Sequence, residues 1–130
     1  MKYTKTEEAN GTHLQGYLNA DYRELVEVFG EPIRYEADGT SHLNNKIDAE
    51  WRLKFQDGTI ATIYNYKNGV NYMGAEGLRL MEIQKWNVGG NSERAVERVK
   101  TEVIDWQHRL HDTGKSTNNW VTAWKLAFPN

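Results

Sequence analysis

The most regular pattern of apolar and polar positions lies in the middle of the chain, where the two kinds of residue alternate. The run Ala49-Glu50-Trp51-Arg52-Leu53-Lys54-Phe55 places every second side chain in an apolar set. This period of two predicts a half-buried strand over 49–55. Asp57-Gly58 follows and supplies the residue pair that a two-residue type I′ hairpin turn requires. The segment 59–67 is rich in β-branched and aromatic residues, which predicts the second strand of a hairpin.

A two-residue turn fixes the register of this hairpin, because strand pairing can be counted outward from the turn. The pairs on the apolar face are then Phe55 with Ile60, Leu53 with Thr62, Trp51 with Tyr64, and Ala49 with Tyr66. The opposite face carries polar residues, with Asp48 and Lys67 as a cross-strand ion pair of the kind that contributes roughly 0.2–1 kcal/mol. We therefore expect the rings of Trp51 and Tyr64 side by side beneath a helix.

Two segments repeat their apolar residues at helical spacing. In 21–29 the apolar stripe follows Asp21, which forms a capping box with Glu24, and Gly30 ends the predicted helix. In 92–111 five apolar residues are spaced 3, 4, 3 and 4 apart along a mostly charged helix. They are Val96, Val99, Val103, Trp106 and Leu110.

The remaining segments have weaker patterns. We expect residues 1–13 to be flexible, 33–46 to form a loop or a weak edge hairpin, and 68–77 to form a glycine-spaced, mobile loop. A third strand is predicted over 78–88, and Gly89-Gly90 would break it. Leu80 and Trp86 would lie on one face of this strand and Met81 and Ile83 on the other, so a bulge is expected to bring these apolar residues to one face. Residues 120–128 are spaced for a short terminal helix, and a strand is the alternative.

These elements predict one α+β domain over residues 1–130. Its small antiparallel sheet, of three or more strands, packs an aromatic face against the long C-terminal amphipathic helix, and a short helix lies near the N-terminus. A chain of 130 residues is too short to divide into two useful cores. The hydrophobic fraction of 38% is modest for a core. Five Trp, seven Tyr and three Phe compensate, because each of these side chains buries a large apolar area.

Composition narrows the functional classes. The chain has no cysteine, which excludes disulfides, thiolate metal sites and cysteine nucleophiles. The net charge of -2 argues against strong non-specific binding to nucleic acid. No apolar run reaches 18 residues, and the N-terminus lacks the apolar stretch of a signal peptide. We therefore expect a cytoplasmic protein without a membrane segment.

Three groups of residues have the types or the spacing of a catalytic or ligand site, and each has a simpler structural explanation. His108 and His111 are spaced to share a metal, but no HExxH-type motif accompanies them, and a cationic helix end accounts for them. Asp48 and Glu50 lie on one strand face and could act as an acid–base pair or bind a hard cation, although they fit a solvated sheet face. The 69–77 glycines match neither phosphate-binding fingerprint. We expect no catalytic residue, no metal and no cofactor.

Aromatic residues give the main candidates for binding. Tyr64 and Trp51 are assigned to the core in preference to a base-stacking platform, whereas core and binding roles stay open for Tyr66 and Tyr72. The terminal segment holds three large rings in nine residues, which either complete the core or form an interface. The predicted binding residues are Tyr66, Lys67, Tyr72, Gly74, Trp120, Trp124 and Phe128.

Several short motifs lie between residues 14 and 90. They are Leu14-Gln15-Gly16-Tyr17, Tyr22-Arg23-Glu24-Leu25-Val26 with Phe29-Gly30-Glu31-Pro32, Asp48-Ala49-Glu50-Trp51, Asp57-Gly58-Thr59, Ala61-Thr62-Ile63-Tyr64-Asn65-Tyr66-Lys67, and Trp86 with Gly89-Gly90. Together they resemble a family of small, largely uncharacterised bacteriophage proteins, whose pattern Tyr72 and Gly74 also fit. The resemblance does not extend to the helix and tail after residue 90.

The resemblance implies a binding function and carries over no catalytic residue. Small accessory phage proteins often bind a host enzyme or a defence system such as CRISPR and block it, or they sequester a signalling nucleotide. We therefore predict a phage accessory protein in the host cytoplasm that inhibits a host or anti-phage defence protein, for example an anti-CRISPR. A small-ligand or nucleotide-binding module is the alternative, and a small enzyme that uses Asp48 and Glu50, or the helix histidines, ranks last. A homodimer, through the long helix or the terminal aromatics, is also open.

Overall fold

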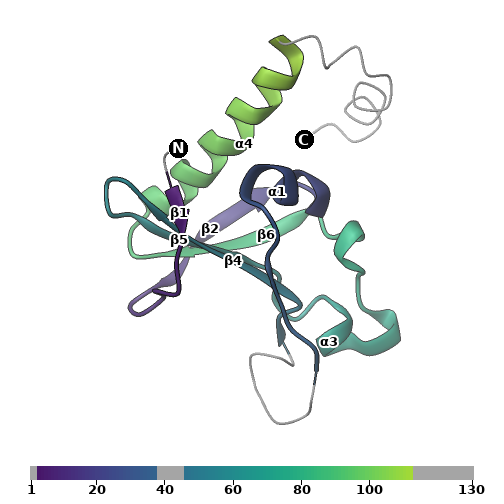
Figure 1. Ribbon diagram of the computed structural model, residues 1–130. Coiled ribbons are helices and arrows are strands. Elements are labelled where there is room, and N and C mark those ends of the chain that lie inside the picture. Colours follow the sequence, from purple (N-terminus) through teal and green to yellow (C-terminus); the bar gives the residue numbers. More distant parts are fainter. Residues whose placement is uncertain (1–2, 38–45, 113–130) are drawn as a thin grey trace.

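The computed structural model describes residues 3–37 and 46–112, which form one sheet covered on one face by helices (Figure 1). The strands are β1 (Tyr3–Lys5), β2 (His13–Asn19), β3 (Ile33–Arg34), β4 (Ala49–Phe55), β5 (Ile60–Tyr64) and β6 (Lys85–Gly90). The helices are α1 (Tyr22–Phe29), α3 (Val70–Met73) and α4 (Arg94–Asp112), with 3₁₀ turns η1 (Gly74–Glu76) and η2 (Leu80–Glu82). The predicted α+β class is confirmed. The predicted terminal helix at 120–128 lies outside the described residues.

All the strand pairs of the sheet are antiparallel, and its strand order is β1-β4-β5-β6-β2. The short strand β3 pairs with the first part of β4, so the start of the predicted loop or edge hairpin is an edge strand. Figure 1 shows α1 and α4 on the same side of the sheet, while α3 lies at the other end of the molecule. None of the helices within 3–37 and 46–112 has the length and apolar character needed to cross a membrane.

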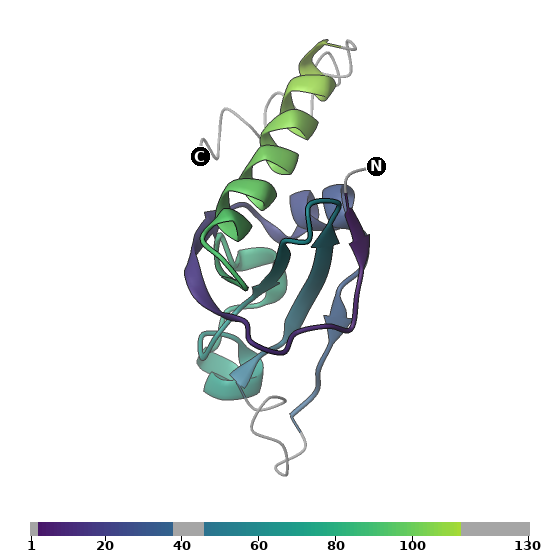
Figure 2. The same cartoon turned by 90° about the vertical axis from the view of Figure 1, so that its left-hand side faces the viewer.

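The N-terminal residues differ from the prediction of a flexible end. Tyr3–Lys5 forms the edge strand β1, and the seven-residue strand β2 begins at His13. The Tyr3 ring packs 5.4 Å from Phe29 and 5.5 Å from Phe55, and its hydroxyl donates to the Val28 carbonyl at 2.5 Å. Between the two strands the chain crosses the face of the sheet opposite the helices (Figure 2). The Tyr3 ring, together with the pairing of β1 with β4, therefore holds a segment that is otherwise polar.

The β4–β5 hairpin forms where it was predicted, but with a register one residue away. The Phe55 N–H donates to the Thr59 carbonyl at 2.8 Å and the Gly58 N–H donates to the Phe55 carbonyl at 3.0 Å. The loop therefore has three residues, a turn followed by Gly58 at a φ of 88°, as in hairpins with a glycine bulge. The Arg98 guanidinium also binds the Asp57 carboxylate at 2.6 Å, which joins this loop to α4.

This shift changes which side chains share a face. Trp51 lies opposite Ile63, and Tyr64 lies opposite Glu50 on the other side of the sheet. The predicted juxtaposition of Trp51 with Tyr64 is therefore wrong, because adding one residue to a hairpin loop moves the partner strand by one step and inverts its faces. Trp51 instead packs edge-on against Trp86, with ring centroids 5.5 Å apart.

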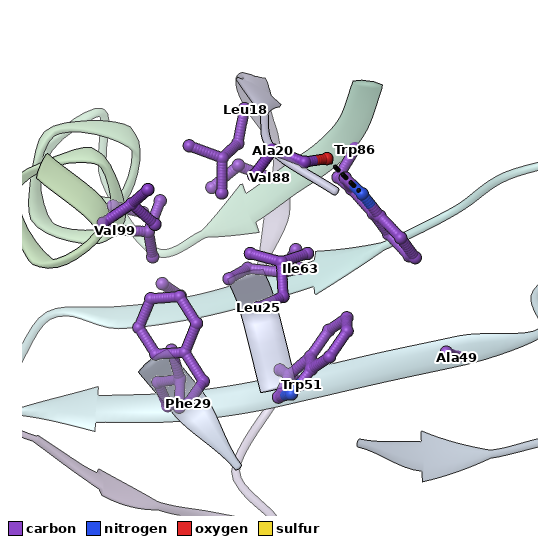
Figure 3. Close-up of a cluster of buried hydrophobic side chains, with 14 of the residues drawn as sticks. Leu18, Ala20, Leu25, Phe29, Ala49, Trp51, Ile63, Trp86, Val88 and Val99 are labelled. Atoms are coloured by element: carbon purple, nitrogen blue, oxygen red, sulfur yellow. Dashed lines mark hydrogen bonds between the residues drawn. The ribbon is translucent and has the colours of Figure 1, made fainter. Parts of the chain in front are cut away.

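The core lies between the sheet and the two longer helices (Figure 3). Trp86 is fully buried, and its indole N–H donates to the Ala20 carbonyl at 2.9 Å. The Trp51 indole N–H donates to the Gly30 carbonyl at 2.7 Å, at the end of α1. The other buried members include Leu18, Leu25, Phe29, Leu53, Ile63, Val88 and Val99. Both large rings thus bury their apolar area and satisfy their one polar atom.

The third predicted strand is corrected at both ends. Its first half is the 3₁₀ turn η2, so no bulge is needed to place Leu80 against the core while Met81 is exposed. Its second half, β6, continues through Gly89 and Gly90 instead of stopping there. A Cβ at Gly89 would lie 2.5 Å from the Thr62 hydroxyl oxygen, so the glycine allows neighbouring groups to approach closely.

Both long helices agree with their predicted apolar stripes. The capping box of α1 is present: the Glu24 N–H donates to the Asp21 carboxylate at 2.8 Å, and the Asp21 N–H donates back to Glu24 at 3.3 Å. In α4, Val99 and Val103 are buried. Val96, Trp106 and Leu110 are half-buried, and Ala95 joins the core as a position that the stripe did not include.

Candidate functional site

Three of the predicted binding residues form one exposed cluster after strand β5. The Lys67 ammonium lies 5.3 Å from the centroid of the Tyr66 ring and 5.6 Å from that of the Tyr72 ring. The two tyrosines are 43% and 49% exposed. Lys67 has a φ of 60°, which residues other than glycine rarely adopt. Cation–π contacts at such exposed sites contribute about 0.5–1 kcal/mol each, so the surrounding structure must hold Lys67 in this conformation.

The segment that carries Tyr72 is helical, which corrects the prediction of a mobile glycine loop. Val70–Met73 forms α3 and Gly74–Glu76 continues as η1. Gly74, another predicted binding residue, ends α3 with a φ of 66° and has no atom near the place where a Cβ would stand. Its position is explained by this backbone conformation, which glycine adopts at little cost.

A buried polar network anchors the cluster to the sheet. Asn65 is fully buried; its Oδ1 accepts from the N–H groups of Asp48 at 2.8 Å and Ala49 at 3.1 Å. Its Nδ2 donates to the Asp48 carboxylate at 2.8 Å and to the side chain of Asn68 at 3.1 Å. The second Asp48 oxygen accepts from the Asn71 N–H at 3.2 Å. This network, which we call the Asp48–Asn65 network, fixes the chain on both sides of Lys67.

Close backbone packing completes the anchor. A Cβ at Gly69 would lie 2.0 Å from the Asp48 carboxylate, and one at Gly77 would lie 2.3 Å from the Gly69 carbonyl oxygen. The Asn71 side chain donates to the carbonyls of Tyr35 at 2.9 Å and Ile47 at 3.0 Å. The cluster is therefore presented by a fixed support, which lowers the entropy cost of binding.

Exposed apolar side chains are concentrated in the same part of the chain. Ten large apolar residues of the described chain are exposed, and six of them lie between residues 66 and 81: Tyr66, Val70, Tyr72, Met73, Leu78 and Met81. We call these six, together with Lys67, the 66–81 surface. Beside it is a shallow groove of about 670 Å³, lined in part by Val70, Met81, Arg34 and Arg79. Concentrations of exposed apolar groups on a soluble domain mark interaction sites.

The two carboxylates considered for catalysis do not face each other as an acid–base pair. Asp48 belongs to the Asp48–Asn65 network, so the predicted ion pair with Lys67 is wrong. Glu50 accepts from the Tyr35 hydroxyl at 2.8 Å and from the Arg52 guanidinium at 3.1 Å. Both side chains are buried, and both have structural partners that account for their positions.

The Tyr35–Glu50 contact predicts a stability change at high pH. Burial, followed by the hydrogen bond to Glu50, raises the pKa of Tyr35 from 10.0 to about 12. Because the folded pKa is raised, the hydrogen bond contributes fully below pH 10, and its contribution is lost as the pH rises from about 10 to 12. We expect the 295 nm titration of wild type to show a tyrosine with a pKa about two units above normal. Tyr35→Phe should lack it, and a Tyr35→Phe titration that retained it would assign the shift to another ring.

The histidines and the terminal aromatics add nothing to this surface within the described residues. His13 lies in β2 and His108 on α4. Within 3–37 and 46–112 no group of three acidic or histidine side chains is placed to hold a metal. The His111 side chain, His42, Trp120, Trp124 and Phe128 lie outside the described part of the chain.

Sequence reasoning missed the Asp48–Asn65 network, although a signal for it exists. Asn65, Asn68 and Asn71 recur at every third position just after a strand. Asparagine side chains there can bond to the backbone of a turn, and this spacing could have marked the segment as ordered. Comparison of the chain with protein-family models, curated proteins and solved structures found no match.

Proposed function

We propose that this chain is a small accessory protein that acts by stoichiometric binding to another protein through the 66–81 surface. The observation that carries the proposal is the exposed Tyr66–Lys67–Tyr72 cluster on a buried, fully bonded support. Tyrosine is enriched among the residues that contribute most of the binding energy in protein interfaces, and two of them are exposed in this cluster. The cost of keeping Lys67 in a rare backbone conformation is consistent with selection for function at this point.

The proposed partner is a host protein or a component of an anti-phage defence system, such as a CRISPR effector. This part of the proposal rests on the resemblance to small phage proteins, in which stoichiometric inhibition is a common mode of action. Binding needs only a rigid surface, and the two buried carboxylates are already engaged in structural contacts.

A capture experiment with matched variants tests the proposal. Tagged wild type, Tyr66→Ser/Tyr72→Ser and the control Ile33→Ser/Ile104→Ser are each incubated with bacterial lysate. The control pair is exposed to a similar extent and lies outside the 66–81 surface. We expect a protein that wild type and control retain and that the tyrosine variant loses by at least about tenfold, equivalent to about 1.4 kcal/mol. The purified partner should then form a complex of fixed stoichiometry with wild type. Equal retention by all three baits would overturn the role of this surface.

The nucleotide-binding alternative has one observation in its favour. The Tyr66 and Tyr72 rings could stack a base, and the Lys67 ammonium, 5.3 and 5.6 Å from their centroids, could neutralise a phosphate. A ligand that binds only the folded chain stabilises it by about 2.7 kcal/mol at a hundredfold excess over its dissociation constant. A panel of nucleotides and cyclic oligonucleotides that raised the melting temperature of wild type, but not of Lys67→Ala, would favour this alternative over protein binding.

A further inference from the structure

The outer edge of strand β2 is separate from the 66–81 surface. Among residues 3–37 and 46–112, β2 is the last strand of the sheet and pairs on one side only, with β6. Within the described residues, no hydrogen bond joins the backbone of His13–Asn19 to any group on the other side. Peptide groups in this position template the addition of another strand.

The direction of these groups follows from the pairing with β6. The Ala20 N–H donates to the Gln84 carbonyl at 3.0 Å. Because the peptide groups of a strand alternate in direction, Leu18 and Gly16 also bond toward β6, and the N–H and C=O groups of Tyr17 and Asn19 point away from the sheet. Tyr17 is 45% exposed, and the Lys85 ammonium lies 4.5 Å from the centroid of its ring.

The edge has little of the protection that sheet proteins commonly use. Leu14 through Asn19 contains no charged residue and no proline. Charged side chains and proline are the usual means by which edge strands avoid pairing. A register shift between Leu14 and Gly16 marks a bulge, which limits regular pairing to the part of β2 that follows it.

We propose that a second copy of this chain pairs with this edge, so that two β2 strands run antiparallel about a two-fold axis at Tyr17. An antiparallel pair is self-complementary, as a two-fold interface requires. Tyr17 would lie opposite Tyr17 of the other copy, with each N–H bonded to the other's carbonyl. Gly16 would lie opposite Leu18, which places the smallest residue against a large one, and the paired residues of β2 themselves carry no charge.

The expected dimer is weak and depends on concentration. The paired segment spans only the few residues between the bulge and Asn19, so the pair itself covers less than the 1,200–2,000 Å² or so of a standard stable interface. Gly16 also faces α4, since a Cβ there would lie 2.9 Å from Val96. The apolar side of the edge is therefore already packed within each copy, and the new contacts are the backbone bonds and the Tyr17 rings.

Single cysteines test this register sharply, because the natural chain has none. Directly opposed residues of a hydrogen-bonded antiparallel pair have Cα atoms about 5.5 Å apart, within the range of about 4.4–6.8 Å for a disulfide. Tyr17→Cys should form a disulfide-linked dimer under mild oxidation. The backbone groups of Asn19 point outward from the same edge. In the proposed register, however, the two Asn19→Cys residues of a dimer would be about 13 Å apart along the strands. We expect cross-linking of Asn19→Cys to be at least about tenfold slower, as for the exposed control Tyr66→Cys.

A second measurement uses chains without cysteine. In sedimentation equilibrium, wild type should show a monomer–dimer equilibrium. Tyr17→Lys should shift this equilibrium toward monomer, because it places two lysines opposite each other at the two-fold axis. Its circular dichroism spectrum should match that of wild type. Equal cross-linking at positions 17 and 19, or faster cross-linking at 66, would overturn the proposed register. A wild type that is monomeric at millimolar concentration would overturn the proposal altogether. Neither outcome affects the protein-binding function, because the two surfaces share no residue.

Discussion

Trp86→Ala is expected to lower the free energy of unfolding by about 3–5 kcal/mol, the range measured for truncating large buried aromatics. Trp86, on β6, is fully buried, and its ring packs near those of Tyr22 on α1 and Trp51 on β4. Removing it leaves a large cavity and an unpartnered Ala20 carbonyl. Because a domain of this kind has about 5–15 kcal/mol of stability in total, the variant should be near its unfolding limit in urea titration at 25 °C.

Two further variants separate the contributions to this loss. Trp86→Phe fills much of the space but cannot donate to Ala20, so it should lose less than Trp86→Ala, with about 1–3 kcal/mol from the unpaired carbonyl. Met81→Ala, at a position that is 59% exposed, should change stability by less than about 0.5 kcal/mol. A Trp86→Ala protein as stable as Met81→Ala would contradict the placement of this ring at the centre of the core.

The second large effect is expected at the Asp48–Asn65 network. Asn65→Ala removes two donated and two accepted hydrogen bonds at a fully buried site, and it leaves the Asp48 carboxylate and two backbone N–H groups without this partner. Unsatisfied buried groups cost about 1–3 kcal/mol each, and more when one is charged. We expect a loss of at least about 3 kcal/mol, measured by urea titration, together with faster amide exchange in residues 66–78.

The same network allows a charge-specific control. Asn65→Asp keeps the shape of the side chain but places a second carboxylate 2.8 Å from Asp48, where asparagine now donates. Two carboxylates at this distance cannot both ionise readily, so the variant should be destabilised at neutral pH and should recover part of its stability as the pH falls. Asn10→Ala, at an exposed loop position, should have little effect at any pH. Equal losses for Asn65→Ala and Asn10→Ala would show that the network does not anchor the segment.

The binding surface was only partly predictable. Tyr66 and Tyr72 were predicted as binding residues because they stand at the end of the predicted second strand and in the loop after it, and Lys67 was predicted together with them. The Lys67 ammonium lies near both rings because Lys67 has a positive φ and the chain then turns into α3. The pattern of apolar and polar residues in the sequence shows neither feature. Strand β2 was not predicted, because a bulge between Leu14 and Gly16 interrupts the alternation of apolar and polar residues. Gly16 also stands at a position that faces α4, where an apolar side chain would have marked the buried face.

The sequence by itself determined the elements whose signals are local. The alternation of 49–55, the capping box at Asp21 and the apolar stripe of α4 each specify a strand or a helix through contacts a few residues apart. These signals were enough to predict an α+β domain in which an antiparallel sheet packs against the long C-terminal helix.

Only the tertiary structure decided how the elements meet. Gln56-Asp57-Gly58 forms a three-residue loop, and this choice places Ile63, not Tyr64, opposite Trp51. Local sequence permits either loop length, and the two differ by one residue in register. The packing of α1 and α4 on the sheet favours the register that buries Ala61 and Ile63 together, because one step of slip would turn both to the other face.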